Sequence, residues 1–179
     1  MDTKETLQKL AGEIELLKTA SKNKLSMIVF SGDMDKLLAS FIIATGAVAM
    51  GYEVVMFFTF WATPALRDRR KKSKEKDFFG KLFGFMLPRG TSRVKLSKMN
   101  MGGMGTAMMK SLMKKKNVAS LEDMVSLAAE LGVRIYVCDM SMDLMGFKQE
   151  EMIDYPDLQF VGVAKFLEEA GDSKIQLFI

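Results

Sequence analysis

The sequence predicts an α/β domain with a mainly parallel sheet of about five strands and a long insertion after the second strand. Short apolar segments alternate with segments of helical periodicity, and short loops join them everywhere except in residues 67–116. Strands that are joined through a helix lie parallel in one sheet, and their crossovers are right-handed, so few other topologies fit this order. The alternation and its one long interruption therefore define the expected fold class.

An amphipathic helix is predicted over residues 1–22, ahead of a single domain over residues 23–179. One face of this helix carries four apolar residues at spacings of three and four: Leu7, Leu10, Ile14 and Leu17. The stripe extends over barely two heptads, which is too short to predict a coiled coil. Packing on the domain itself and a contact between subunits are therefore equal alternatives.

A strand–helix–strand unit is predicted at the start of the domain. Residues 25–30 and 53–60 are apolar runs, typical of parallel strands that are covered on both faces. The uncharged run 37–52 is shorter than the roughly 20 residues that a membrane-spanning helix needs. We therefore predict a buried helix over residues 34–50, which ends at Gly51.

The insertion over residues 67–116 holds most of the basic charge. It contains 16 Lys or Arg and three acidic residues, whereas the whole chain has a formal charge of +4. Within this region a short basic helix is predicted over residues 65–76, and a Met-rich helix over residues 104–116. Such a block is usually a solvated face and sometimes an anion-binding surface. We expect no nucleic-acid partner, and peripheral membrane contact is left open.

Regular alternation resumes after the insertion. Ser120 and Asp123 form an N-cap signature for a helix that ends at Gly132, and a strand follows over residues 133–137. The remaining predicted elements are a helical turn, a strand, a helix and a last strand, over residues 148–152, 158–163, 164–170 and 174–179.

Candidate chemistry centres on Cys138, which follows the strand over residues 133–137. It is the chain's single cysteine, and the chain contains no histidine, so this thiol is the one nucleophile that a small perturbation could activate near neutral pH. A Cys–His dyad, an internal disulfide and a Cys/His zinc site are excluded. The 17 methionines are interpreted as adaptable packing residues, and neither a metal nor a cofactor is expected. The alternative is a buried cysteine that only packs.

Ligands of open parallel sheets bind beyond the carboxyl ends of the strands. We expect Cys138 to be the catalytic residue there and six residues to line its pocket: Ser31, Gly32, Asp33, Trp61, Met140 and Ser141. A helix that begins after Asp139 or Ser141 would favour the thiolate, as would cations of the insertion if it folds over the crevice.

Five segments resemble the DsrE/DsrF-like family of small sulfurtransferases, specifically its branch with a long Met-rich insertion. The specific one is residues 138–146, Cys-Asp-Met-Ser-Met-Asp-Leu-Met-Gly. The other four are residues 57–61, 99–105, 107–110 and 162–167. The resemblance extends from about Lys24 to Ile179, which is nearly the whole domain.

The resemblance implies a flavodoxin-like three-layer α/β subunit that forms homo- or hetero-oligomers. It also implies that Cys138 accepts sulfane sulfur as a persulfide or thiosulfonate, from a donor such as an anionic sulfur species. The sulfur would then pass to a TusA-type carrier or another relay protein.

The N-terminal residues lack the basic-then-apolar order of a signal peptide, so the cytoplasm is the expected compartment.

Two rival functions stay open. One is a non-catalytic binding or scaffold module that uses the basic insertion and leaves Cys138 buried. The other, weaker one is a thiol peroxidase, because single thiolates also oxidise to sulfenic acid. Replacing Cys138 separates the first rival from the sulfur carrier, since a scaffold would keep its partner binding.

Overall fold

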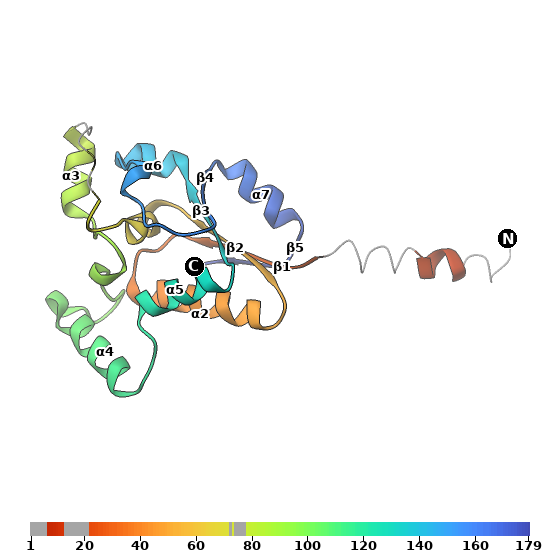
Figure 1. Ribbon diagram of the computed structural model, residues 1–179, viewed down its shortest axis with the longest axis horizontal. Helices are drawn as coiled ribbons and strands as arrows, with labels where there is room; N and C mark the ends of the chain where they lie inside the picture. Colours follow the sequence, from red (N-terminus) through yellow and green to blue (C-terminus); the bar gives the residue numbers. More distant parts are fainter. Residues whose placement is uncertain (1–6, 13–21, 72, 74–77) are drawn as a thin grey trace.

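One parallel sheet organises the computed structural model, which describes residues 7–12, 22–71, 73 and 78–179. Its strands have the spatial order β4-β3-β2-β1-β5, and all neighbouring pairs are parallel (Figure 1). The strands are β1 (Lys22–Val29), β2 (Glu53–Phe58), β3 (Arg134–Cys138), β4 (Leu158–Val161) and β5 (Ser173–Phe178). The expected α/β fold class with a mainly parallel, five-stranded sheet is confirmed.

Helices cover the sheet on both faces, which makes three layers (Figure 1). Helices α2 (Met34–Ala49) and α5 (Leu121–Glu130) pack side by side on one face, and α7 (Val163–Gly171) covers the other. The cause is the direction of the crossovers. The connections through α2 and α5 step toward β4, whereas the connection through α7 returns past β1 to β5, so right-handed crossovers place α7 on the opposite face.

Strand β2 explains why both faces of the sheet are apolar. Val54, Met56 and Phe58 contribute to the core under α2 and α5, while Val55 and Phe57 belong to a smaller cluster under α7. All five side chains are buried, because successive side chains of a strand point to opposite faces and both faces are covered. The uninterrupted apolar run in the sequence reflects this double burial.

A buried ionic cluster lies under α7, near the amino ends of β1 and β3. The Glu169 carboxylate accepts hydrogen bonds from the Lys24 ammonium, from Tyr136 Oη at 2.9 Å and from Arg134 at 3.3 Å. Burial raises the pKa of Glu169, but the hydrogen bonds from Lys24 and Tyr136 and the charge of Arg134 outweigh it and lower this pKa to about 2. The cluster therefore contains an ionised carboxylate that ties α7 to the sheet.

The insertion between β2 and α5 differs from the sequence prediction. The short basic helix over residues 65–76 is wrong within the described residues, since the 3-10 helix η1 (Phe60–Leu66) ends there and Arg67 pairs antiparallel with Met152. The Arg67 side chain is buried, 3.7 Å from Glu151 and 4.5 Å above the Phe147 ring. These tertiary contacts override the helix propensity of a Lys/Arg-rich segment.

The rest of the insertion is made of short elements. Helix α3 (Phe78–Met86) forms in an aromatic-rich segment for which the sequence predicts no helix, and α4 (Met104–Lys115) matches the predicted Met-rich helix. Two 3-10 turns lie between them, η2 (Thr91–Arg93) and η3 (Met101–Gly103). Both α3 and α4 lie at the edge of the domain (Figure 1).

Two further segments complete the chain. After β3 the backbone continues as α6 (Asp139–Met145) and the 3-10 turn η4 (Gln149–Glu151). The second matches the helical turn predicted over residues 148–152, and the first begins next to the position at which a helix would favour the thiolate. In the N-terminal segment residues 7–12 are helical, whereas Ile14 and Leu17 of the predicted stripe lie outside the described residues. Over the described part of the chain, no helix combines the length and hydropathy that spanning a bilayer requires.

Candidate functional site

Cys138 lies at the carboxyl end of β3 and is the N-cap residue of α6. Its side chain points to the α7 face of the sheet, as does that of Tyr136 two residues earlier. It is a free cysteine with 4% of its surface exposed. The thiol therefore stands at the strand end, as expected from the sequence, but it is closed off from solvent.

Helix α7 provides the cover over this thiol. Phe166 and Ala170 of α7 belong to the same buried cluster as Cys138, and Val161 of β4 packs against it. The Phe166 ring stacks on that of Phe57 with 5.0 Å between the ring centroids, which places α7 firmly over β2. A reagent can contact the sulfur only if this cover moves.

Met140 and Ser141 follow Cys138 closely in the sequence, but one is exposed and the other is buried. Ser141 is buried, its Oγ lies 2.7 Å from Thr59 Oγ1, and it accepts a hydrogen bond of 3.1 Å from the Phe60 backbone N–H. Ser141 therefore fixes α6 to the end of β2. Met140 is 60% exposed on the first turn of α6.

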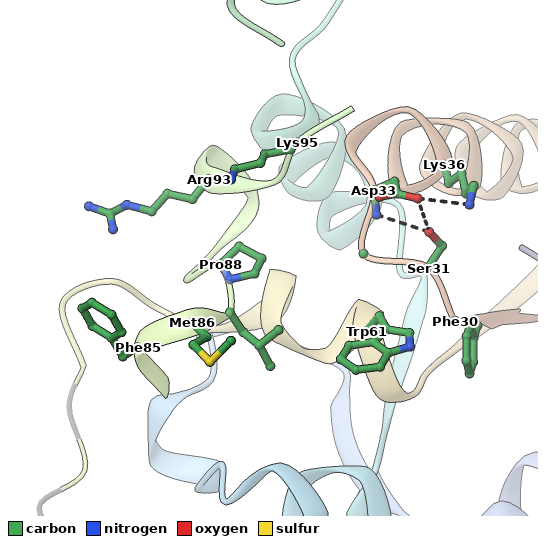
Figure 2. Close-up of a pocket in the computed structure, with 12 residues that line it drawn as sticks. Phe30, Ser31, Asp33, Lys36, Trp61, Phe85, Met86, Pro88, Arg93 and Lys95 are labelled. Carbon is green, nitrogen blue, oxygen red and sulfur yellow. Dashed lines mark hydrogen bonds and ion pairs between the residues drawn. The ribbon is translucent and has the colours of Figure 1, made fainter. Parts of the chain in front are cut away.

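A cavity of about 620 Å³ lies beyond the carboxyl ends of β1 and β2 (Figure 2). Four of the predicted residues line it, namely Ser31, Gly32, Asp33 and Trp61, whereas Cys138, Met140 and Ser141 do not. Eight further residues complete the lining: Phe30, Lys36, Phe85, Met86, Leu87, Pro88, Arg93 and Lys95. The predicted site is thus divided between this cavity and the buried thiol.

The loop between β1 and α2 forms one wall of the cavity. Ser31 Oγ donates a hydrogen bond of 2.9 Å to Asp33, whose carboxylate also pairs with Lys36 Nζ at 3.0 Å. Gly32 is required by the close approach of η1, because a Cβ at this position would lie 2.1 Å from the Trp61 carbonyl oxygen. The loop and Trp61 therefore form a closely packed unit.

The insertion forms the opposite wall, which the sequence did not predict residue by residue. Residues 85–88 comprise the last two residues of α3 and the two that follow it, while Arg93 ends η2 and Lys95 lies just beyond it. The Lys95 carbonyl oxygen accepts a hydrogen bond of 2.8 Å from the Met34 N–H, at the start of α2. The insertion therefore folds over the strand ends. Of its described cations, Arg93 and Lys95 line the cavity, and none belongs to the buried cluster around the thiol.

Metal chemistry has no candidate centre in the described part of the chain, where no three or more Cys, Asp or Glu side chains gather as a ligand set. The chemistry that the arrangement offers is a single thiol with an apolar cover and, apart from it, a cavity with aromatic and cationic walls.

Comparisons with known proteins agree with this architecture. Residues 21–178 match the model of the DsrE/DsrF/DrsH-like family. Protein YrkE of Bacillus subtilis (strain 168) is 43% identical over 161 residues, which cover 90% of this chain and 99% of the relative. The sulfur carrier protein DsrE2 of Allochromatium vinosum is 38% identical over 162 residues, covering 88% and 99% of the two chains.

A solved structure supports the fold alone. The crystal structure of the ychN protein from E. coli superimposes with a TM-score of 0.54 and 10% identity, covering 87% of this chain and 98% of that one. The family match, in contrast, extends over the whole sheet and all the helices that flank it. This chain therefore belongs to the DsrE/DsrF/DrsH-like family.

Proposed function

We propose that this protein is a sulfur carrier that holds sulfane sulfur on Cys138 and passes it to a partner protein. One observation carries the proposal: the chain's single thiol stands at the end of β3 in a protein that is 38% identical to a sulfur carrier protein. Without a histidine the chain offers Cys138 no imidazole base. A carrier does not need one, because thiol exchange requires only a thiolate.

Both transfer steps are thiol exchanges that conserve atoms and charge. The Cys138 thiolate attacks the terminal sulfur of a donor persulfide, so that a new S–S bond forms on Cys138 while the donor's S–S bond breaks and releases its thiolate. In the second step an acceptor thiolate attacks the terminal sulfur of the Cys138 persulfide and takes it away. No net oxidant or reductant is consumed.

Access to the thiol is part of this proposal. Since Cys138 is 4% exposed, a donor contacts it only when Phe166 and the rest of α7 shift from the sheet. Ser141 positions α6, the helix that begins directly after the cysteine, through Thr59 and Phe60. In this view the four predicted residues at the cavity are not in contact with the sulfur.

Mass spectrometry of the intact protein tests the proposal directly. The protein is incubated with thiosulfate, tetrathionate or polysulfide, and we expect an adduct of sulfur or thiosulfonate mass that a thiol reductant removes. The matched control is Cys138→Ser, which should gain no mass. An unmodified wild-type protein after all three donors would contradict the carrier function.

A TusA-type acceptor and a homo-oligomer belong to the same proposal. Val163 and Leu167 of α7 are 58% and 61% exposed, and a second subunit would cover apolar side chains on the helix that closes off Cys138. Light scattering on the wild type and on Leu167→Glu tests this association. A wild-type monomer would contradict it.

A second candidate function is a binding module, which helix α4 favours. Met104, Met108 and Leu112 are exposed at successive i, i+4 positions, so they form one stripe on the outer face of a helix that projects from the domain (Figure 1). Lys114, Lys115 and Lys116 follow, and no acidic residue occurs in residues 78–121. This pattern is typical of a helix that binds an anionic membrane surface.

Co-sedimentation with vesicles tests the second candidate. We expect binding to vesicles that contain phosphatidylserine, weak binding to pure phosphatidylcholine, and loss of binding in Met108→Gln. Cys138→Ser should bind as the wild type does. Equal binding to the two kinds of vesicle, or none to either, would contradict a role of the basic surface.

A further inference from the structure

We propose that the cavity between the β1–α2 loop, Trp61 and the insertion is a binding site for a small organic anion with an apolar body. This site is separate from Cys138, so the proposal does not depend on sulfur transfer. It rests on the size of the cavity, its aromatic and thioether lining, and the charge of the insertion wall.

The size and lining of the cavity match those of a small-molecule site. Its volume of about 620 Å³ lies in the range of 300–1,000 Å³ that is usual for ligand pockets. Three large apolar side chains in its walls, Trp61, Phe85 and Met86, are exposed, and Phe85 has 90% of its surface in solvent. An apolar ligand body would remove these surfaces from water.

The cationic side chains of the cavity differ in whether they have an ion-pair partner. Lys36 pairs with Asp33, so their charges compensate each other. The side chains of Arg93 and Lys95 make no hydrogen bond or ion pair with any other residue that the structure describes. Among the described residues, the cavity therefore has two positive charges without a partner, Arg93 and Lys95, while its one acidic lining residue, Asp33, is paired.

The two charges stand beside the apolar wall. Figure 2 shows Arg93 and Lys95 on the same side of the cavity as Phe85, Met86 and Pro88, with Trp61 toward the other side. A ligand that pairs with these cations thus has apolar surface next to its charged group. An inorganic oxyanion would leave the aromatic surface uncovered, and a neutral ligand would leave both cations without a partner.

The cationic wall is attached to the rigid part of the fold. Besides the bond from Met34 to the Lys95 carbonyl oxygen, Ser97 donates two hydrogen bonds to the Asp35 carboxylate, at 2.8 Å from its N–H and 2.6 Å from its Oγ. Asp35 lies in the first turn of α2. Because one anchor is the Lys95 backbone itself and the other lies two residues later at Ser97, this part of the wall is already positioned before a ligand binds.

Trp61 provides a direct readout, since it is the chain's single tryptophan and lines the cavity. We would titrate the protein with 3-phenylpropionate, with the matched sulfonate 3-phenylpropane-1-sulfonate, and with the neutral 3-phenylpropanol. We expect both anions to change the Trp61 emission, with dissociation constants at least tenfold lower than that of the alcohol. Cys138→Ser should bind them as the wild type does, which separates this result from the carrier proposal.

Substitutions assign the contribution of the two cations. Arg93→Gln and Lys95→Gln change exposed side chains without described partners, so we expect folded proteins whose affinity for both anions falls several-fold, and the double variant should lose at least tenfold. Lys98→Gln, an exposed lysine of the same segment outside the cavity lining, is the matched control. The proposal is wrong if neither anion changes the emission, if the alcohol binds equally well, or if Lys98→Gln weakens binding as much as the double variant.

Discussion

The two faces of the sheet are covered in different ways. Under α2 and α5, helices of 16 and 10 residues enclose a large apolar core, in which Phe41 and Phe58 pack with 6.0 Å between their ring centroids. Under α7, one helix of nine residues covers a small cluster and an ionic network around Glu169. Cys138 lies on this second face, so the thiol is closed off by the thinner of the two covers.

Because of this difference, the stability of the domain and the access of reagents to the Cys138 thiol depend on different faces of the sheet. The α2 face contributes mainly hydrophobic burial, which stabilises the domain without limiting contact with the thiol. The α7 face contributes few apolar contacts and depends on buried charges, whose pairing is sensitive to the loss of one partner. We therefore expect substitutions on the two faces to affect unfolding and thiol reactivity in different proportions.

Phe58→Ala should give the largest loss of stability. Phe58 is fully buried in the core under α2, and removing a buried ring leaves a cavity, so we expect the free energy of unfolding to fall by about 4 kcal/mol. Urea unfolding measures this change. A loss below about 1 kcal/mol would contradict the assignment of the main core to this face.

Glu169→Gln should give the next largest loss of stability. It leaves the Lys24 ammonium, which is itself buried, without its carboxylate, and we expect a loss of about 3 kcal/mol in the free energy of unfolding. Glu168→Gln is the matched control, because Glu168 is exposed and pairs only with Lys165 among the described residues. Equal losses in the two variants would mean that the buried cluster does not hold α7.

Phe166→Ala should reduce the free energy of unfolding less but increase the reactivity of the Cys138 thiol most. The side chain lies in the small cluster on one face of α7, so we expect a loss of about 2 kcal/mol. Alkylation of Cys138 by iodoacetamide should accelerate at least tenfold relative to the wild type. Phe58→Ala is the control, and the rate of its alkylation should rise only as far as global unfolding explains. Faster alkylation in Phe58→Ala than in Phe166→Ala would mean that α7 is not the route to the thiol.

The elements of the sheet could be predicted because their signals are local. The strands appear as apolar runs, and the helix after residue 120 has its cap in adjacent residues, where Ser120 and Asp123 form a capping box. The insertion could not be predicted in the same way. Gly80 and Gly84 lower the helix propensity of the segment that forms α3, while Arg67 leaves the expected helix for contacts with distant residues of the chain.

The site could be predicted only in part, for a related reason. Strand order predicts which loops meet beyond the sheet, and four of the six residues expected at the Cys138 pocket line one cavity, but Cys138 is not part of it. The burial of Cys138, in contrast, depends on tertiary contacts, namely the pairing of β3 with β4 and the packing of α7 on that face of the sheet. The wall that contains Arg93 and Lys95 is likewise held by contacts with α2, such as that between Ser97 and Asp35, 62 residues apart.

The smallest effect is expected from Tyr136→Phe, which removes one hydrogen bond to Glu169 and keeps the ring in place. A group whose pKa is lower in the folded state than in the unfolded state stabilises the fold above its unfolded pKa, and this stability is lost as the pH falls through the folded pKa. For Glu169 that window extends from the ordinary pKa of 4.5 down to about 2.

Losing the Tyr136 hydrogen bond should raise the folded pKa of Glu169, so the variant should lose about 1 kcal/mol near neutral pH and show a smaller further loss in acid than the wild type. Urea unfolding at a series of pH values between neutrality and the folded pKa measures both differences. Parallel curves for the wild type and Tyr136→Phe would mean that Lys24 and Arg134 alone keep the carboxylate ionised. The attachment of α7 would then rest on its cations, and Tyr136 would serve only as apolar packing beside Cys138.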